Sequence, residues 1–211
     1  MSARIEDRGD RVIVWNGNTA KRGALSPELY AAIHEAVALA QEPRIRAVIL
    51  TSEGDFFCAG GNLNVLIERR AMSEPDRRDK VDELHDLVRG IRDCPVPVIA
   101  AVEGGAAGAG LSLALASDFI VAAENAKFTA AYVKAGLVPD GGLTSAMARM
   151  LPRPLAMEMC LLGRAVPAIR FAELGAVNVI YPAGQAMAEA MLLADALALA
   201  FDMTPEEAEA Q

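Results

Sequence analysis

Residues 102–118 read VEGGAAGAGLSLALASD, a glycine-rich loop that leads directly into an apolar run. Four glycines, at positions 104, 105, 108 and 110, leave the backbone of this loop uncovered by side chains. Small residues allow a ligand to approach a backbone closely, and the N-terminus of a helix adds partial positive charge there. The stretch therefore predicts a buried strand, a loop that presents backbone N–H groups, and a buried helix.

The same order of strand, small-residue loop and helix occurs earlier, in AVILTSEGDFFCAGGNLNVL at residues 47–66. Two such loops on neighbouring strands can direct two N–H groups at one oxygen atom, which is the requirement for an oxyanion hole. Tight packing of a helix on a strand would also explain the glycines, so their spacing alone leaves the role of the loops open. No lysine follows either loop as in a P-loop, and no GxSxG nucleophile elbow occurs.

Composition excludes several classes of protein. The chain has 211 residues, of which 53% are hydrophobic, and this suits one sizeable core. Its net charge of −8 argues against a nucleic-acid surface. Three separated cysteines form no CxxC pair, which indicates free thiols and no metal site. The charged N-terminal segment lacks the apolar run of a signal peptide, and no membrane-length span occurs, so we expect a cytoplasmic protein.

Predicted strands alternate with predicted helices, which places the chain in the α/β class. We expect strands at 11–16, 46–53, 95–104 and 177–182, and two short strands within 118–130 that flank a turn at 124–125. We expect helices at 26–41, 79–94, 111–117, 143–152, 154–163 and from 183 onward, with a restart at Thr204. Ser26 is the expected N-cap of the first helix. The charged segment 68–80 is expected to be a solvated connection.

Several segments together resemble the enoyl-CoA hydratase/isomerase (crotonase) superfamily. They are GDFFCAGGNL, PVIAAVEGGAAGAGLSLALASDFIVAAENAKF and KAGLVPDGGLTSAMARMLP, and the resemblance runs in register from Arg11 to Pro182. It implies a crotonase-like spiral core of ββα turns over residues 1–182, a C-terminal helical segment over 183–211, and assembly into homotrimers or hexamers. Members usually continue through further helices, so we expect the C-terminal region here to be short or incomplete.

The resemblance also implies an acyl-CoA substrate, with coenzyme A as part of the thioester and no tightly bound cofactor. The thioester oxygen would lie between the backbone N–H groups of Gly61 and Ala109. Enolisation puts negative charge on that oxygen, and the loss of one fixed donor costs roughly 3–4 kcal/mol in related cases. Further coenzyme A contacts are implied for Lys21, Arg22, Ala24, Ala59, Gly61 and Leu63.

The acid–base residues depart from the hydratase pattern. Hydratases of this family use two glutamates, and the corresponding positions here are Ser112 and Tyr132. Neither residue is a carboxylate, and free tyrosine loses its proton only near pH ~10. Asp140 lies in the loop GLVPDGG, where isomerase-like members similar to the ring-opening phenylacetyl-CoA enzyme carry an aspartate as their single acid/base. Asn62 replaces an acidic residue that is common after the first oxyanion position.

These residues predict an enoyl-CoA isomerase in which Gly61 and Ala109 hold the enolate oxygen and Asp140 transfers the proton. Other interpretations stay open. The sequence PDGG is itself typical of a β-turn, Ser112 fits the first turn of a helix, and Tyr132 fits either a pocket wall or the core. The alternatives to an isomerase are a hydratase with atypical catalytic residues and a non-catalytic acyl-CoA-binding protein.

Overall fold

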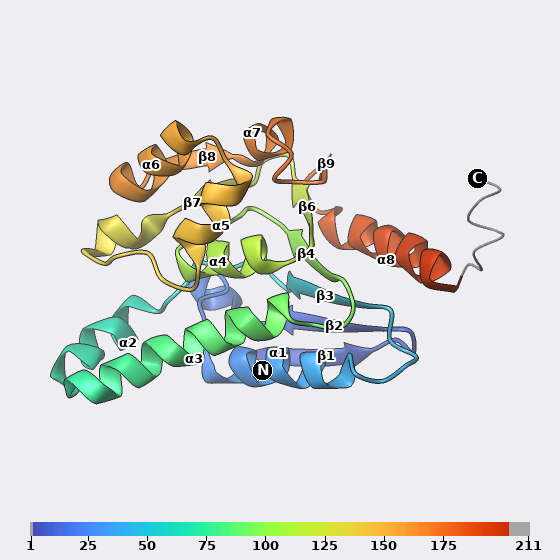
Figure 1. The fold of residues 1–211 in the computed structure, drawn as a ribbon, viewed down its shortest axis with the longest axis horizontal. Coiled ribbons are helices and arrows are strands. Elements are labelled where there is room, and N and C mark those ends of the chain that lie inside the picture. The colour runs from blue at the N-terminus through green and yellow to red at the C-terminus, as the bar shows by residue number, and fades with distance from the viewer. Residues whose placement is uncertain (1, 203–211) are drawn as a thin grey trace.

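The computed structural model describes residues 2–202, which form an α/β fold around two β-sheets (Figure 1). The strands in this part of the chain are β1 (Ala3–Asp7), β2 (Arg11–Asn16), β3 (Ala47–Ser52), β4 (Val98–Val102), β5 (Gly105–Ala107), β6 (Phe119–Ala123), β7 (Lys127–Thr129), β8 (Ala165–Pro167) and β9 (Val179–Tyr181). The helices are η1 (Thr19–Lys21), α1 (Pro27–Leu39), α2 (Leu63–Glu68), η2 (Arg69–Ala71), α3 (Glu74–Arg92), α4 (Ala109–Ala116), η3 (Ala131–Ala135), α5 (Leu143–Met150), α6 (Arg153–Leu162), α7 (Ala168–Glu173) and α8 (Ala186–Asp202).

The larger sheet has six strands in the order β1-β2-β3-β4-β6-β9, and only its β1–β2 pair is antiparallel. Every residue of β3 is buried. Val48 and Leu50 point to one core cluster, whereas Ala47 and Ile49 belong to a second cluster on the opposite face. The prediction that this strand is buried on both faces is therefore confirmed, and it follows from the alternation of side chains along a strand.

The two faces of this sheet are covered by different helices. Helix α1 packs against β1 and β2, α3 packs against α1, and α4 packs against α3 (Figure 1). The opposite face carries α8, whose alanines at 186, 190 and 194 are buried against β2, β3, β4 and β6. The small side chains of this alanine stripe let α8 lie close to the sheet.

Helix starts show where capping chemistry decides a boundary. Ser26 caps α1 as predicted, since its side chain accepts a hydrogen bond of 3.3 Å from the backbone N–H of Leu29. The expected solvated connection over 68–80 is wrong beyond Ser73. Helix α3 begins at Glu74 because the Ser73 hydroxyl accepts the N–H of Asp76 and Pro75 occupies the first turn.

The smaller sheet contains two strands that the sequence patterns did not predict. Its order is β5-β7-β8, and β5 forms inside the glycine-rich loop itself. Residues Gly105, Ala106 and Ala107 pair in parallel with Lys127, Phe128 and Thr129. The glycine loop is thus partly a strand, and its pairing with β7 holds the second half of the loop in place. The turn expected at 124–125 separates β6 from β7 as predicted.

Glu103 follows β4 and caps the start of α8. Its two carboxylate oxygens accept backbone N–H groups, from Gly184 at 3.0 Å and from Ala186 at 2.9 Å. Negative charge at a helix N-terminus is stabilising. The buried Arg11 on β2 holds the same helix further along, through an ion pair of 2.6 Å with Asp195.

The predicted helical restart at 204 lies outside the described residues.

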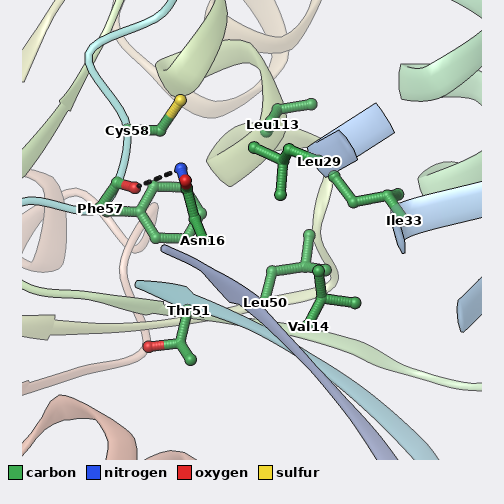
Figure 2. A pocket seen from close by; sticks show the side chains of 9 residues that line it. All are labelled: Val14, Asn16, Leu29, Ile33, Leu50, Thr51, Phe57, Cys58 and Leu113. Atoms are coloured by element: carbon green, nitrogen blue, oxygen red, sulfur yellow. Dashed lines mark hydrogen bonds between the residues drawn. The ribbon is translucent and has the colours of Figure 1, made fainter. Parts of the chain in front are cut away.

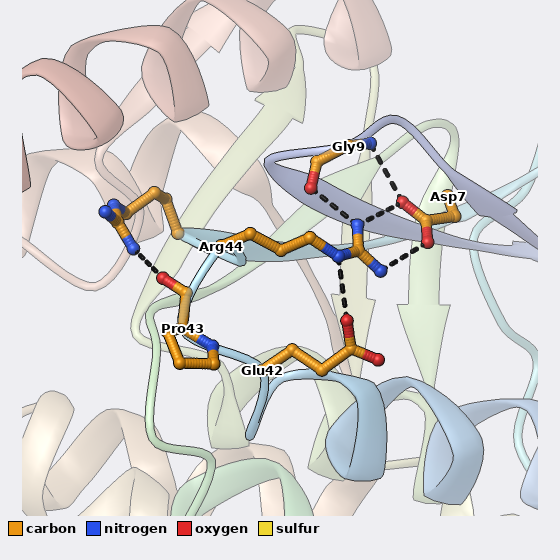
Figure 3. A network of polar contacts seen from close by, with 6 residues as sticks. Asp7, Gly9, Glu42, Pro43 and Arg44 are labelled. Carbon is orange, nitrogen blue, oxygen red and sulfur yellow. Dashed lines mark hydrogen bonds and ion pairs between the residues drawn. The ribbon is translucent and has the colours of Figure 1, made fainter.

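A polar network fastens the β1–β2 turn to the segment before β3 (Figure 3). The Arg44 guanidinium donates to both carboxylate oxygens of Asp7, at 2.7 and 2.8 Å, and to the carbonyl oxygen of Gly9. Hydrogen bonds from Arg44 and then from the Gly9 N–H lower the pKa of Asp7 to about 2.

Among the described residues, no helix has both the length and the apolar character needed to cross a membrane.

Replacing the capping carboxylate tests whether Glu103 anchors α8. We expect Glu103→Ala to lower the free energy of unfolding by about 1 kcal/mol, or the Tm by roughly 2–4 °C, because two helix N–H groups lose their acceptor. Thermal unfolding monitored by circular dichroism measures this change. The matched control is Glu124→Ala, which removes an exposed carboxylate from the β6–β7 turn. Equal Tm values for the two variants would refute the anchoring role.

Candidate active site

The two glycine loops contact each other directly through their backbones. An isolated parallel bridge joins Cys58 to Ala106, and the N–H of Ala107 donates to the carbonyl of Cys58 at 2.9 Å. A Cβ on Gly60 would lie 2.6 Å from the Ala107 carbonyl oxygen, and a Cβ on Gly110 would overlap the Cys58 carbonyl. The close approach of the two loops therefore requires glycine at both positions. Tight packing, the alternative explanation of the glycines given above, holds for Gly60 and Gly110.

The same contact brings the two predicted oxyanion donors to one cleft. Gly61 and Ala109 both line it, and the Ala109 nitrogen would lie only 3.0 Å from a Cβ on Gly60. Ala109 is the first residue of α4, where a backbone N–H has no partner inside the helix. Within the described part of the chain, neither the Gly61 nor the Ala109 N–H donates a hydrogen bond. Two unused donors therefore face the same space, as an oxyanion hole requires.

The cleft has a volume of about 1400 Å³. Its walls come from the two loops, from α1, α2, η2 and the first half of α3, and from the segment that runs from η3 to Asp140. Most of the side chains that face it are apolar, among them Leu63, Val65, Leu66, Ile67, Met72, Val81, Leu84, Leu137 and Val138. This combination of apolar walls and a few polar groups is typical of a small-molecule site.

Asp140 lies in this cleft with one carboxylate oxygen unused. Its Oδ1 is the one buried side-chain nitrogen or oxygen within residues 2–202 that has no hydrogen-bond partner. Its backbone carbonyl, by contrast, accepts three hydrogen bonds: from the N–H of Leu143 at 3.1 Å, from Ser112 Oγ at 3.2 Å and from the Tyr132 hydroxyl at 3.4 Å. The main chain of Asp140 is thus held by three donors, while Oδ1 of its side chain has no partner in the described residues.

Ser112 and Tyr132 meet at the positions where hydratases of the resembled family carry glutamates. Their hydroxyl oxygens are 3.2 Å apart, and both residues are buried. Burial, followed by the nearby charge of Asp140, raises the pKa of Tyr132 far above its ordinary value, so this phenol stays protonated and donates. Ser112 lies in the first turn of α4 and Tyr132 lies in the cleft wall, as two of the interpretations above expected. Together the two hydroxyls hold the Asp140 loop.

The turn interpretation of PDGG holds as well. The hydrogen bond from Leu143 N–H to the Asp140 carbonyl closes a turn through Gly141 and Gly142, whose φ angles are +57° and +72°. A Cβ on Gly141 would lie 3.0 Å from the Ser112 Cβ. The turn therefore lets the loop approach α4 closely and directs Asp140 toward the cleft.

The remaining predicted contact residues divide into two groups. Ala59, Gly61 and Leu63 line the cleft, whereas Lys21, Arg22 and Ala24 are not among its lining residues. Lys21 and Arg22 are exposed, and Ala24 is buried.

The segment that carries Lys21, Arg22 and Ala24 supports the first loop. The Arg22 carbonyl accepts the N–H of Ala59 at 3.0 Å, and its guanidinium lies 4.0 Å from the ring centre of Phe56. Asn62 caps the short helix α2, since its Oδ1 accepts the N–H of Asn64. Compared with the acidic residue that the family resemblance implies at this position, Asn62 keeps the capping acceptor and carries one charge fewer.

Several polar residues of the cleft were not found from the sequence, among them Tyr30 and Arg69. Tyr30 lies on α1 and Arg69 begins η2, and both side chains line the cleft. Burial raises the pKa of Tyr30 to about 12. No motif marks either residue, because Tyr30 belongs to a helix whose pattern indicates only amphipathic packing and Arg69 belongs to a charged segment that was expected to be a solvated connection.

A second, much smaller cavity of about 10 Å³ lies in the core behind the first loop (Figure 2). Its lining includes Cys58, whose thiol pKa burial raises to about 12, and Asn16, which bonds the Phe57 carbonyl. The space is at the lower limit for one water molecule, so it is no substrate site. Within residues 2–202, no cluster of three or more His, Cys, Asp or Glu side chains could hold a metal ion.

A matched pair of glycine substitutions tests the contact between the loops. Gly60 and Gly9 have similar positive φ angles, +85° and +92°, but a Cβ on Gly9 meets nothing within 4 Å. We expect Gly9→Ala to cost about 1–2 kcal/mol through φ alone. Gly60→Ala should cost about 1–3 kcal/mol more because the methyl group forces the loops apart. Urea unfolding of both variants measures the difference, and equal losses would contradict the close approach described here.

Comparison with known proteins identifies the family. The chain matches the family model described as Enoyl-CoA hydratase/isomerase over residues 17–207. It is 36% identical over 197 residues to enoyl-CoA hydratase EchA19 of Mycobacterium tuberculosis, which covers 92% of this chain and 74% of that protein. It is 38% identical over 156 residues to 1,2-epoxyphenylacetyl-CoA isomerase of Escherichia coli, covering 73% of this chain and 60% of the relative.

The fold agrees with solved structures. A crystal structure of an enoyl-CoA hydratase from Polaromonas sp. JS666 superposes with a TM-score of 0.89 at 46% sequence identity, covering 93% of this chain and 77% of that one. The predicted crotonase-like α/β fold is therefore confirmed. The chain spans about three-fifths of the Escherichia coli isomerase and about three-quarters of the mycobacterial hydratase. With its family model, relatives and fold in agreement, this chain belongs to the enoyl-CoA hydratase/isomerase family.

Proposed function

We propose that this family member isomerises unsaturated acyl-CoA thioesters, with Asp140 as the single acid/base. The observation that carries the proposal is the buried, unpaired Asp140 Oδ1 in the same cleft as the unused Gly61 and Ala109 N–H groups. An unpaired buried carboxylate oxygen is costly, and such a group calls for a functional explanation. A base that faces two oxyanion donors supplies that explanation.

The proposed reaction moves one proton and leaves the atom count unchanged. Asp140 removes a proton from a carbon of the acyl group, and the electron pair of the broken C–H bond shifts toward the thioester oxygen. The N–H groups of Gly61 and Ala109 stabilise the negative charge of the resulting dienolate. Protonated Asp140 then returns the proton to a different carbon, so the double bond migrates without addition of water.

Water addition is the second candidate, because relatives such as the mycobacterial protein are named hydratases. Against it stands the role of Ser112 and Tyr132, whose hydroxyls lie 3.2 Å apart and both donate to the Asp140 carbonyl. Neither hydroxyl is a carboxylate that can activate water. The other acidic side chains of the cleft, Glu83 and Asp86, are already in ion pairs with Lys80 and Arg89.

Asp140→Asn is the central substitution. We expect it to lower kcat for double-bond migration by at least about 10²–10⁴-fold, because the amide cannot accept the proton, while the affinity for the thioester changes little. The measurement is NMR detection of the product from 2-enoyl-CoA and 3-enoyl-CoA, together with calorimetric binding of a saturated acyl-CoA. Full turnover by the variant would eliminate Asp140 as the base.

The same assay separates the alternatives. A hydratase would convert the 2-enoyl thioester into a 3-hydroxyacyl product and lose the absorbance of the conjugated thioester. A non-catalytic protein would be stabilised against heat by the thioester without forming any product. Either result would replace the isomerase proposal.

The hydroxyl pair offers a further test of how Asp140 is positioned. We expect Ser112→Ala and Tyr132→Phe each to lower kcat by about tenfold with little change in KM, because each removes a donor to the Asp140 carbonyl and so alters the position of the base. The double variant should lose less than the product of the two single effects, since both donors serve one carbonyl. Strictly multiplicative losses would contradict a shared positioning role.

A further inference from the structure

One wall of the cleft carries three arginines without ion-pair partners. Arg69 and Arg70 lie on η2 and Arg77 lies on α3, and all three line the cleft. No ion pair of theirs occurs within residues 2–202. This concentration of unpaired positive charge stands out in a chain whose net charge is −8.

The acidic groups on the same wall do not neutralise these arginines. Glu83 forms an ion pair of 2.5 Å with Lys80, and Asp86 forms one of 2.8 Å with Arg89. The unpaired arginines therefore face an apolar cleft in which Asp140 is the remaining carboxylate, and no ion pair joins Asp140 to them in the described chain.

Arg69 differs from the other two arginines in its burial. It is half-buried, unlike the exposed Arg70 and Arg77. Burial is the main cause of the raised pKa of the Tyr30 phenol. The charge of Arg69 opposes this rise, and the charge of Asp140 adds to it. Tyr30 therefore lies within electrostatic reach of both, and its hydroxyl has no hydrogen-bond partner within the described residues.

We propose that Arg69 and Tyr30 form a subsite for an acyl group whose far end carries a carboxylate. The placement of the thioester at the two loops rests on the proposed function; the subsite itself rests on an unpaired, half-buried guanidinium and an unpaired phenol that line the same apolar cleft. A guanidinium binds a carboxylate through two parallel hydrogen bonds, and a protonated phenol adds a third donor. The apolar side chains Leu66, Leu84 and Val138 suit the methylene chain between the two ends of such a substrate.

Phosphate groups of coenzyme A are the other anions that could reach an arginine. The segment that carries Lys21 and Arg22 supports the first loop from outside the cleft lining, through the hydrogen bond from the Ala59 N–H to the Arg22 carbonyl. Arg69 instead shares Tyr30 with Asp140, the group that must face the acyl carbons in the proposed reaction. Arg69 and Asp140 line one cleft, whereas Lys21 and Arg22 are not among its lining residues, and this placement favours the acyl carboxylate over a phosphate.

Binding of unreactive ligands tests the subsite without relying on catalysis. The probes are a saturated dicarboxylic acid joined to coenzyme A through one carboxyl, and the methyl ester of the same compound. Both are also prepared on N-acetylcysteamine, which lacks the phosphates. Isothermal titration calorimetry compares the wild type with Arg69→Gln, Arg69→Lys and Tyr30→Phe. The control is Arg78→Gln, because Arg78 is exposed on α3, pairs with Glu74 and does not line the cleft.

We expect the wild type and Arg78→Gln to bind the free carboxylate about tenfold more tightly than its methyl ester. Arg69→Gln should abolish that preference on both carriers, and Arg69→Lys should retain part of it. Tyr30→Phe should reduce it. A wild type without preference would overturn the proposal. So would equal losses for both acyl groups on coenzyme A with none on N-acetylcysteamine, since that result would assign Arg69 to a phosphate.

The same titrations in Asp140→Asn separate this inference from the isomerase proposal. A carboxylate preference that persists in this variant supports the subsite even if no double bond migrates. Turnover that depends on Asp140 but shows no carboxylate preference would support the isomerase and eliminate the subsite.

Discussion

The direct contact between two backbone segments is the constraint on which the rest of this site depends. Gly60 approaches the Ala107 carbonyl and Gly110 approaches the Cys58 carbonyl so closely that neither position has room for a side chain. The contact joins a loop that follows β3 to a loop that follows β4, and these strands are neighbours in the larger sheet. Adjacent parallel strands therefore place two unused N–H groups in one cleft, and the glycines determine how near they come.

The strand β4 also connects the site to the C-terminal helix. Glu103 directly follows this strand, caps α8 with both carboxylate oxygens, and directly precedes Gly104 and Gly105 of the glycine loop. The packing of α8 on the far face of the sheet and the position of the second loop thus share one short segment. Ser112 and Tyr132 act in a similar way on the other side of the cleft, because their hydroxyls hold the main chain of Asp140 and leave its Oδ1 unused.

Features encoded locally could be predicted from the sequence. The buried strand β3, the Ser26 cap and the loop–helix transition at Ala109 follow from apolar runs, capping residues and glycines. The short strands β5 and β8 could not be predicted in this way, because three residues are too few to show a period. The start of α3 was missed although Ser73 and Asp76 form a recognisable cap.

The features of the candidate site also fall into those that the sequence could predict and those that it could not. Motifs located Gly61, Ala109 and Asp140, but nothing local indicates that Asp140 Oδ1 is unpaired, since that depends on residues distant in sequence. The placement of Tyr30 and Arg69 in the lining of one cleft is likewise a product of the tertiary fold. Glu103 had no interpretation until α8, about eighty residues later, was seen to begin on it.

The central claim is that the Gly61 and Ala109 N–H groups and the Asp140 carboxylate act on one thioester. A crystal structure of the protein with a saturated, unreactive acyl-CoA tests this claim most directly. The account predicts a thioester oxygen within about 2.7–3.1 Å of both backbone nitrogens, with the Asp140 carboxylate against the acyl carbons that follow the carbonyl. A thioester oxygen bound by other donors, or an Asp140 carboxylate directed away from the acyl chain, would contradict it.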